Sequence, residues 1–325
     1  MAQRTFTEER ARTVLAAALP HYRDGSAKAR LLALGENAVF ALDSLSLVVR
    51  IGRDLELWDR AARELRVADW LAAEGLPAVR PSRRYGPEQP LPFDGHLVTF
   101  WEQLPDPVRP AGAVDLAELL RLVHALPEPD AGPDSGADAG TVAQPGPDAE
   151  PEPRPRLSLP RRELLGGVER WLRLAGEAID PADADYLRGR RDGFAEAAAT
   201  LTPQLPPGPI HGDALPRNVQ VGPDGPVLVD LETFASDLRE HDLVVMALSR
   251  DRYGLDPAAY DAFTAAYGWD VREWAGCTVL RGARETASCA WVAQHAPGNA
   301  RALAEFRRRV ASLRDDDPTV RWFPF

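Results

Sequence analysis

Apolar residues in the first part of the chain fall into short runs that are separated by turn-forming residues. Residues 30–34 and 38–43 are two such runs, on either side of Gly35-Glu36-Asn37, and residues 44–52 form a third that is rich in β-branched side chains. Short apolar runs of this kind, bounded by turns, are typical of β-strands. The sequence therefore predicts three successive strands here.

The pattern changes to helical spacing directly after the third run. Residues 54–75 place apolar side chains three or four positions apart and end at a glycine, Gly75. The apolar positions are Leu57, Ala61, Leu65, Ala68 and Leu71. Residues 77–86 and 95–104 follow as two more short strand-like runs. We therefore expect a small sheet with one helix inserted after the third strand.

Helical patterns dominate the chain after Pro160, apart from one hairpin. Candidate helices cover residues 258–268, 271–296 and 299–313. Residues 1–22 also read as an amphipathic helix, without the apolar core and small-residue cleavage site of a signal peptide. The expected fold class is α+β, with a β-rich N-terminal lobe and a mainly α-helical C-terminal lobe.

Residues 127–160 interrupt this pattern with a segment rich in Pro, Gly, Asp and Ala. Such a composition cannot bury enough apolar surface to fold, so we predict a disordered insertion. Helical patterns flank it at residues 114–126 and 161–179, and these two segments could pack together with the insertion looping out.

Composition narrows the possible partners. The formal net charge of −11 argues against nucleic acid, although seven acids and no Lys or Arg lie between Pro127 and Pro153, so the remaining chain is only mildly acidic. No apolar run reaches the length of about 18 residues that a membrane span needs. Cys277 and Cys289 are the only cysteines, which is too few for a disulfide framework or a zinc site, and we expect a cytoplasmic protein.

The hairpin after Pro160 carries candidate chemistry. Two short apolar runs, residues 218–221 and 226–231, flank the turn sequence Gly-Pro-Asp-Gly at residues 222–225. Pairing across this turn puts Asn218 opposite Val229, one residue before Asp230. The carboxamide of Asn218 and the carboxylate of Asp230 are then expected at the same end of the hairpin, within roughly 5–8 Å of each other.

A third oxygen-bearing group, Asp213, lies in the loop that leads into the hairpin. Two carboxylates and one carboxamide suit a hard cation such as Mg²⁺, which binds one or two carboxylates and completes its shell with water and phosphates. One of the three groups can instead orient a hydroxyl and accept its proton. Protein kinases space these groups as H-R-D-x-x-x-x-N before a second Asp, and here His211-Gly212-Asp213 precedes Asn218 and Asp230.

This string, H-G-D-x-x-x-x-N followed by a strand that ends in Asp, resembles the aminoglycoside phosphotransferase / choline kinase-like family. Residues 34–42 resemble the hairpin that covers the nucleotide in that family, residues 47–52 its third strand, and residues 97–104 the strand that leads to the adenine-binding hinge. Residues 239–248 are similar to the segment that follows the metal-binding Asp. The resemblance covers nearly the whole chain apart from the insertion.

The resemblance implies a protein kinase-like two-lobe fold. Residues 1–102 would form the nucleotide-binding lobe, and residues 103–325 would form the catalytic and acceptor-binding lobe. Asp213 would be the catalytic base, and Asn218 and Asp230 would bind Mg²⁺. His211 and Asp242 would be structural supports of the loop.

The same resemblance assigns the nucleotide site. Arg50 would contact the α- and β-phosphates of ATP (or GTP) and pair with Glu64, Gly35 would lie in the phosphate-covering loop, and the backbone near Trp101 to Gln103 would meet the adenine. Two features depart from the kinase pattern: Arg50 stands where kinases typically carry Lys, and the loop at Gly35 lacks G-x-G-x-x-G. The only lysine, Lys28, lies too early in the chain to replace it.

Taken together, these features predict an Mg²⁺-dependent phosphotransferase that moves the γ-phosphate of ATP or GTP to a hydroxyl of a small molecule. Glu232, Asp237 and Glu240 are candidate acceptor contacts. The acceptor could be an aminoglycoside or another antibiotic, which would give resistance by modification, or a metabolite such as an amino alcohol or a sugar. A catalytically weak, nucleotide-binding kinase-like protein is the alternative from another class. A protein kinase is less favoured, because the sequence lacks D-F-G and A-P-E.

Overall fold

The computed structural model describes residues 6–19, 28–35, 37–85, 88–129 and 157–324. The chain divides into two compact units. The first comprises Met1–Pro110, Glu128–Leu159 and Gln220–Phe234, and the second comprises Ala111–Pro127, Pro160–Val219 and Ala235–Phe325. Most of the predicted insertion at 127–160 lies outside the described residues. The lobe boundary predicted after residue 102 stays a prediction.

A five-stranded antiparallel sheet forms the centre of the first unit. In spatial order its strands are β1 (Arg30–Leu34), β2 (Asn37–Leu42), β3 (Leu47–Gly52), β5 (His96–Glu102) and β4 (Leu91–Phe93). Helix α2 (Trp58–Ala73) follows β3, so the predicted sheet with one helix inserted after the third strand is confirmed.

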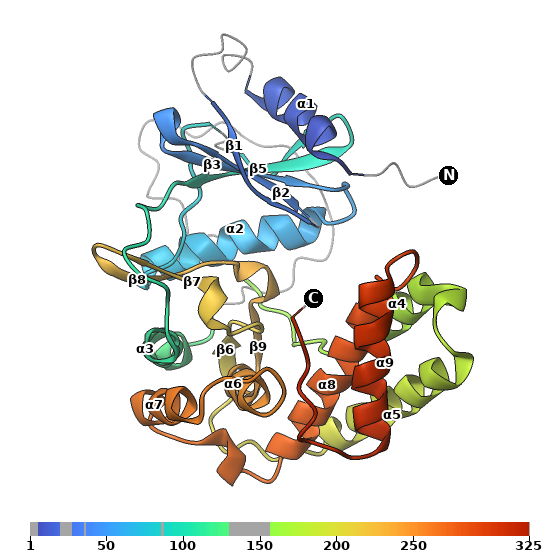
Figure 1. The fold of residues 1–325 in the computed structure, drawn as a ribbon. Coiled ribbons are helices and arrows are strands. Elements are labelled where there is room, and N and C mark those ends of the chain that lie inside the picture. The colour runs from blue at the N-terminus through green and yellow to red at the C-terminus, as the bar shows by residue number, and fades with distance from the viewer. Residues whose placement is uncertain (1–5, 20–27, 36, 86–87, 130–156, 325) are drawn as a thin grey trace, which may run out of the picture. The chain divides into compact units, whose positions relative to one another are not determined.

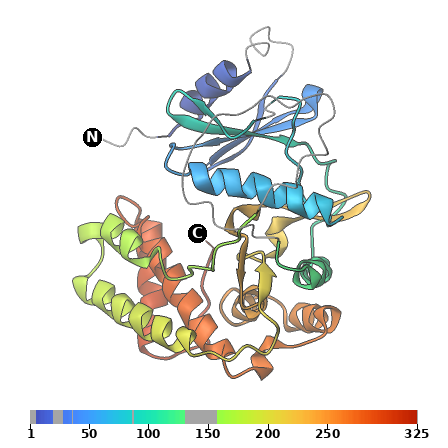
Figure 2. The ribbon, with the colours of Figure 1, turned by 180° about the vertical axis from the view of Figure 1, so that it is seen from behind.

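Helices cover both faces of this sheet (Figure 1; Figure 2). Helix α1 (Glu8–Ala18), which lies within the predicted N-terminal helix, packs Val14 and Leu15 against one face. That face is mainly apolar, because alternate residues such as Phe40 of β2 and Val49 of β3 point to it and are completely buried. Helix α2 lies along the opposite face (Figure 1).

The prediction of a strand at residues 77–86 is wrong. This segment makes only isolated bridges, from Ala78 to Leu228 and from Pro81 to Trp101, and the fifth strand is instead β4 at Leu91–Phe93. Proline has no backbone N–H to donate to a strand ladder, and Pro77 and Pro81 interrupt the segment.

The predicted hairpin is confirmed and belongs to the first unit. Its strands are β7 (Val219–Gly222) and β8 (Gly225–Leu228), and a short 3-10 helix, η5 (Leu231–Thr233), follows. The N–H of Val108 donates to the carbonyl of Val221 at 2.9 Å, and the N–H of Val79 donates to the carbonyl of Leu228 at 2.9 Å. These bonds join the hairpin to the segments that flank the sheet.

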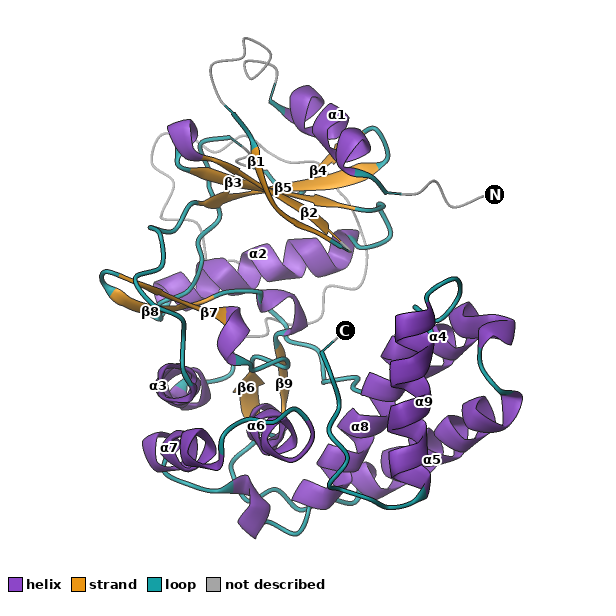
Figure 3. Cartoon of the chain, in the orientation of Figure 1, coloured by secondary structure: helices purple, strands orange, loops and turns teal. Residues whose placement is uncertain are grey.

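The second unit is mainly helical (Figure 3). Its α-helices are α3 (Ala113–Ala125), α4 (Val168–Ala175), α5 (Pro181–Ala199), α6 (Glu240–Arg252), α7 (Pro257–Tyr267), α8 (Cys277–Ala293) and α9 (Ala300–Arg314). Besides η5, the first unit contains the short 3-10 helix η2 (Asp43–Leu45). The second unit contains the 3-10 helices η3 (Gly176–Ala178), η4 (Pro216–Asn218) and η6 (Val271–Glu273). Within the described ranges, no helix combines the length and apolar character needed to cross a membrane.

Helix packing in the second unit differs from the sequence expectation at one point. The segments before and after the insertion do not form a pair: α3 packs mainly on α7, whereas α4 packs on α8, which also contacts α5, α6 and α9. A two-stranded sheet of β6 (Gly208–Ile210) and β9 (Ala235–Asp237) was also not expected from the sequence. Each of these strands is three residues long, which is too short to show the alternation of apolar and polar residues that predicts a strand.

The last described residues pack back onto this helical core. Trp322 is 1 % exposed and its Nε1 donates to the hydroxyl of Ser312 at 3.0 Å. The guanidinium groups of Arg252 and Arg309 lie 4.9 and 5.0 Å from the centre of the Trp322 ring. The N–H of Phe323 donates to Glu305 at 2.8 Å. Trp322 therefore anchors the segment after α9.

Candidate functional site

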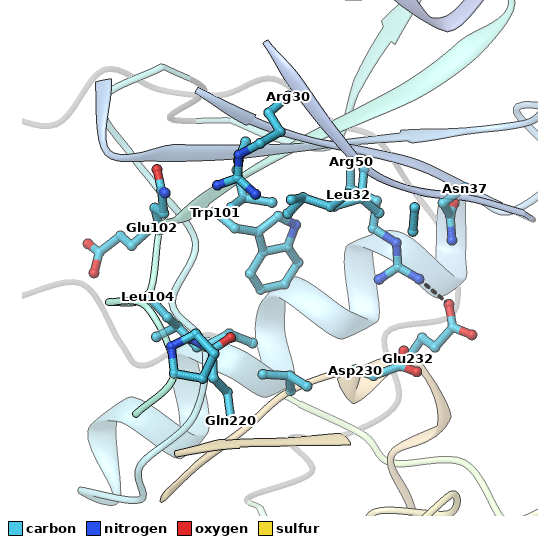
Figure 4. Close-up of a pocket in the computed structure, with 18 of the residues that line it drawn as sticks. Arg30, Leu32, Asn37, Arg50, Trp101, Glu102, Leu104, Gln220, Asp230 and Glu232 are labelled. Atoms are coloured by element: carbon cyan, nitrogen blue, oxygen red, sulfur yellow. Dashed lines mark hydrogen bonds and ion pairs between the residues drawn. The ribbon is translucent and has the colours of Figure 1, made fainter. Parts of the chain in front are cut away.

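A cavity of about 660 Å³ lies in the first unit, on the sheet face opposite α1 (Figure 4). Strand alternation decides which side chains reach it: Val48 and Arg50 of β3 line the cavity, whereas Val49 and Ile51 are buried in the core behind. The register places Arg50 beside Val39 of β2 and Val48 beside Trp101 of β5, so these strands present one continuous surface.

The wall of the cavity at Trp101 to Gln103 is tied to the rest of the first unit. The Nε1 of Trp101 donates to Thr99 at 2.9 Å, and the Nε2 of Gln103 donates to Asp43 at 2.6 Å. The N–H of Glu102 donates to the carbonyl of Arg80, and the N–H of Gln103 donates to the carbonyl of Ser46. These two N–H groups already have acceptors within the protein.

The residues that follow on this wall include Leu104, which also lines the cavity (Figure 4). Among the described residues, no carbonyl accepts its N–H. Gly35 lines the cavity at the end of β1, and its carbonyl accepts a hydrogen bond from Arg53 at 2.9 Å. The predicted nucleotide contacts at Gly35, Trp101 and Gln103 are therefore all brought to one cavity.

The polar end of the cavity is built around Arg50. Its Nη1 donates to both carboxylate oxygens of Glu64, at 2.7 and 2.9 Å, and its Nη2 donates to Glu232 at 2.5 Å. Glu232 also pairs with Arg60. With its carboxamide oxygen turned toward the guanidinium, Asn37 accepts from Nε and Nη2 of Arg50 at 3.0 and 2.8 Å. Strand β3, helix α2 and η5 are thus joined through one side chain.

Electrostatics stabilise the charged form of Arg50. Burial alone would lower its pKa, but Glu64, Glu232 and Asp230 together raise it above the ordinary value. Glu64 is 5 % exposed, and burial raises the pKa of its carboxyl although Arg50 lowers it. The ion pair is therefore a buried one, in which removal of either partner would leave an uncompensated charge.

Asp230 stands two residues after β8 and also lines the cavity (Figure 4). Its backbone adopts the left-handed conformation, with φ 60° and ψ 61°, and its side chain is exposed. Non-glycine residues rarely adopt this conformation, which is concentrated at functional sites. The turn points a carboxylate into the same cavity as Arg50.

In the second unit, the loop after β6 is held by a buried carboxylate. The N–H groups of His211 and Gly212 donate to the two oxygens of Asp242, at 2.7 and 2.8 Å. Asp242 is fully buried on α6, and Nε2 of His124 lies 3.2 Å from it. Gly212 has a φ of +83°, which favours glycine over any residue with a Cβ. His211 itself is also fully buried.

Asp213 follows directly in this loop. Its carboxylate accepts from Nη2 of Arg217 at 2.8 Å, and Nη1 of Arg284 lies 3.6 Å from its other oxygen. Burial would raise the pKa of Asp213, but Arg284 and Arg217 outweigh it and lower the pKa below the ordinary value. The Nδ2 of Asn218 donates to the backbone carbonyl of Asp213 at 2.8 Å, which orients the carboxamide oxygen away from this carbonyl.

All three candidate acceptor contacts already have protein partners. Asp237 is 8 % exposed and accepts from the N–H groups of Arg162 and Leu238, at 3.0 and 2.8 Å, besides pairing with Arg161. Glu240 is fully buried and accepts from the N–H groups of Gln204 and Leu205, at 2.7 and 2.8 Å. The third, Glu232, pairs with Arg50 and Arg60 as described. Contact of these acids with an acceptor stays a prediction.

Sequence reasoning missed three residues that support the loop, two by direct contact and one through Asp242. Arg162 and Arg284 both donate to the carbonyl of Gly212, at 3.2 and 2.8 Å, and His124 contacts Asp242 from α3. They come from segments far from the H-G-D string, and no spacing rule links them to it. Only the three-dimensional packing of the second unit brings them together.

Within the described ranges, no three or more His, Cys, Asp or Glu side chains are grouped so that they could hold a metal ion. The two predicted metal ligands, Asn218 and Asp230, lie in different compact units. Their predicted approach across the hairpin stays a prediction.

Comparison with known families decides the identity of this chain. Residues 29–280 match the model of the phosphotransferase enzyme family. The chain belongs to that family. The phosphotransferase is an enzyme, as the H-G-D string predicted. No curated protein matches the sequence significantly.

Solved structures of small-molecule kinases share the fold of this phosphotransferase. The amicoumacin kinase hAmiN, in complex with AMP-PNP, Ca²⁺ and Ami, has a TM-score of 0.65 and 13 % identity, covering 97 % of this chain and 98 % of its own. A microcompartment-associated aminopropanol kinase has a TM-score of 0.62 and 17 % identity, covering 94 % and 98 %. A choline/ethanolamine kinase family protein from Mesorhizobium loti has a TM-score of 0.56 and 18 % identity, covering 94 % and 99 %. The predicted kinase-like α+β fold is confirmed.

Proposed function

We propose that this phosphotransferase moves the γ-phosphoryl group of ATP, or of GTP, to a hydroxyl of a small molecule. The hydroxyl oxygen forms a bond to the γ-phosphorus while the bond from that phosphorus to the β,γ-bridging oxygen breaks, and ADP or GDP leaves. The hydroxyl proton passes to Asp213. The observation that carries the proposal is the loop at Asp213, whose backbone is held by a left-handed glycine, Gly212, and by the hydrogen bonds of His211 and Gly212 to Asp242.

Asp213 serves chiefly to orient the hydroxyl. Because Arg284 and Arg217 lower its pKa, it stays ionised at neutral pH and presents acceptor oxygens to the hydroxyl. Most of the rate enhancement of phosphoryl transfer comes from positioning and from stabilisation of charge, so a strongly basic group is not required.

The cavity of the first unit would bind the nucleotide. Apolar side chains such as Val39, Val48 and Trp101 suit an adenine ring, and the unpaired N–H of Leu104 provides a donor at its edge. Arg50, oriented by Glu64, would contact the phosphates, and Gly35 would lie over them. Arg50 already donates to Glu232, so phosphate binding would compete with that carboxylate.

Asn218 and Asp230 would hold Mg²⁺. One carboxylate and one carboxamide oxygen are hard ligands that suit this ion, which keeps water and phosphate oxygens in its other positions. Bound there, the metal would neutralise charge on the phosphates. The carboxamide of Asn218 fits this role, because its nitrogen is engaged by Asp213 and its oxygen is directed elsewhere.

The acceptor is an antibiotic or a small metabolite such as an amino alcohol or a sugar. The amicoumacin kinase and the aminopropanol kinase that share the fold exemplify the two classes. A catalytically weak nucleotide-binding protein is the remaining alternative, and the substitution of Arg50 for lysine is the feature that favours it.

The test is MgATP turnover with a panel of hydroxyl compounds, read out as ADP release and as the phosphate mass gained by the acceptor. We expect at least one compound to stimulate turnover. Asp213→Ala should lower kcat by roughly three orders of magnitude or more, since general acid–base and positioning effects multiply. Native protein that binds MgATP but transfers phosphate to nothing would favour the nucleotide-binding alternative.

A further inference from the structure

Arginines, not acids, surround the proposed catalytic carboxylate in the second unit. Arg162 from the segment before α4, Arg284 from α8 and Arg217 from η4 all reach the Gly212–Asp213 segment. The guanidinium groups of Arg162 and Arg284 converge on one carbonyl oxygen, that of Gly212, at 3.2 and 2.8 Å. Three guanidinium groups therefore contact the Gly212–Asp213 segment, whose single ionised carboxylate is that of Asp213.

The nearby acids do not offset this excess of positive charge, because they are engaged elsewhere. Asp237 pairs with Arg161 and accepts two N–H groups. Glu240 is fully buried and caps the chain at Gln204 and Leu205, and Asp242 is fully buried beneath the loop. The three acids at positions 237 to 242 therefore present no accessible carboxylate for an amine.

Arg284 also retains hydrogen-bonding capacity. Its side chain is only 13 % exposed, Nη2 is bound to Gly212, and Nη1 is 3.6 Å from Asp213, but its Nε is buried without a partner among the described residues. A guanidinium carries five N–H donors in a planar fork that matches a carboxylate or phosphate. The neighbouring His241 adds no charge at neutral pH, because burial, together with Arg284 and Arg162 and against the opposing effect of Asp237, lowers its pKa to about 4.

The geometry points to an acceptor that carries an anionic group, such as a carboxylate, near the hydroxyl that is phosphorylated. This inference rests on the proposed function and narrows its substrate class. Arg162 and Arg284 would bind the anion, and Asp213 would orient the adjacent hydroxyl. A cationic acceptor, such as an aminoglycoside or an amino alcohol, would instead meet three arginines.

Two sets of matched acceptors test this. Glucuronate, glucose and glucosamine share one ring, and glycerate, glycerol and 3-amino-1,2-propanediol share one three-carbon chain. Within a set the carbon skeleton is kept, and one hydroxyl-bearing position carries a carboxylate or an amine in place of the neutral group. We expect kcat/KM to be highest for the carboxylate and lowest for the amine, with about a ten- to hundredfold gain of carboxylate over neutral compound from charge-assisted hydrogen bonds. Preference for the amine in both sets would overturn the inference.

Variants separate anion binding from mere support of the loop. Arg284→Gln should raise the KM for the carboxylate and so remove its advantage over the neutral compound. A purely structural role would lower transfer to both compounds by the same factor and leave their ratio unchanged, which would overturn the inference. Arg281→Gln is the matched control: it lies one turn earlier on α8 and pairs with Asp251, so the ratio should stay as in the native enzyme.

Failure of the proposed function gives a different result. If no compound is phosphorylated although MgATP binds, the proposed function fails, and the inference is decided by binding alone. Calorimetric titration of the enzyme loaded with Mg²⁺ and a non-hydrolysable ATP analogue should then show binding of glucuronate or glycerate that Arg284→Gln abolishes. Absence of carboxylate binding at millimolar concentrations, or equal binding of the amines, would overturn the inference.

Discussion

At the scale of single residues, Asp242 is the main support of the loop that carries Asp213. It is fully buried, and its two oxygens accept the N–H groups of consecutive residues, His211 and Gly212. Burial would raise the pKa of Asp242, but the hydrogen bond to His124 and the backbone hydrogen bond from His211 help to lower it below the ordinary value. The carboxylate thus fixes the backbone from which Asp213 projects.

Asp242→Asn should damage both stability and catalysis. One oxygen becomes an NH₂ group that faces a backbone N–H, so a buried hydrogen bond is lost and two donors oppose each other. We expect the free energy of unfolding to fall by about 3 kcal/mol, measured by urea denaturation, and kcat to fall with it. Asp261→Asn, an exposed aspartate on α7, is the control and should leave both unchanged. Unchanged stability of Asp242→Asn would contradict this account.

The pH dependence of transfer follows from Asp213. Its pKa in the folded protein lies below 3.8, so the carboxylate is ionised throughout the neutral and mildly acidic range and loses its charge only as the pH falls through that lowered value. We expect no acidic limb from Asp213 in the kcat–pH profile above about pH 5. Arg284→Gln removes the leading cause of the lowered pKa, so its profile should begin to fall at higher pH than the native one. An unshifted profile would mean that Arg284 does not act on this carboxylate.

At the scale of elements, the segment after α9 depends on one aromatic side chain. Trp322 is almost fully buried, bonded to Ser312 and flanked by Arg252 and Arg309. Trp322→Ala should lower the free energy of unfolding by about 3–5 kcal/mol, the usual cost of emptying a buried aromatic site. The neighbouring Phe323 is 52 % exposed, so Phe323→Ala should cost far less. Thermal or urea unfolding compares the two, and equal losses would contradict the anchor role of Trp322.

Elements with a clear period could be predicted from the sequence, and elements defined by tertiary contact could not. Helix α2 and strands β2 and β3 followed their apolar spacing. The missed strand β4 has three residues, but Asp94-Gly95 after it was a readable signal: both residues have positive φ, at 50° and 81°, as in a tight hairpin turn.

The site divides in the same way. The residues of the H-G-D string and the hairpin are close in sequence, so their spacing was enough to predict phosphoryl transfer. Arg162 and Arg284 lie some 50 and 70 positions away from Gly212 and meet it only through the packing of α8 and the segment before α4. Charge around Asp213 is therefore a property of the folded unit, and the sequence could not assign the sign of the acceptor.

At the scale of the whole molecule, the insertion is the clearest target for truncation. Deleting residues 132–150 should leave the melting temperature unchanged and the transfer rate within about twofold of the native value, because shortening a segment of this disorder-favouring composition should alter the closure entropy only slightly. The deletion keeps Leu157, which is buried, and the segment that positions Arg162. A large loss of activity with unchanged melting temperature would show that the segment takes part in acceptor binding.

The two faces of the sheet place different demands on its side chains. In β2, β3 and β5 neighbouring residues alternate between the core behind the sheet, as at Val49 and Phe100, and the cavity in front, as at Val48 and Trp101. Mutation at one position therefore changes either folding or ligand preference, seldom both. A lineage can vary Val39, Ala41 and Val48 to alter which base it accepts while the interior stays intact. Related proteins of equal stability can then differ in their preference for ATP or GTP.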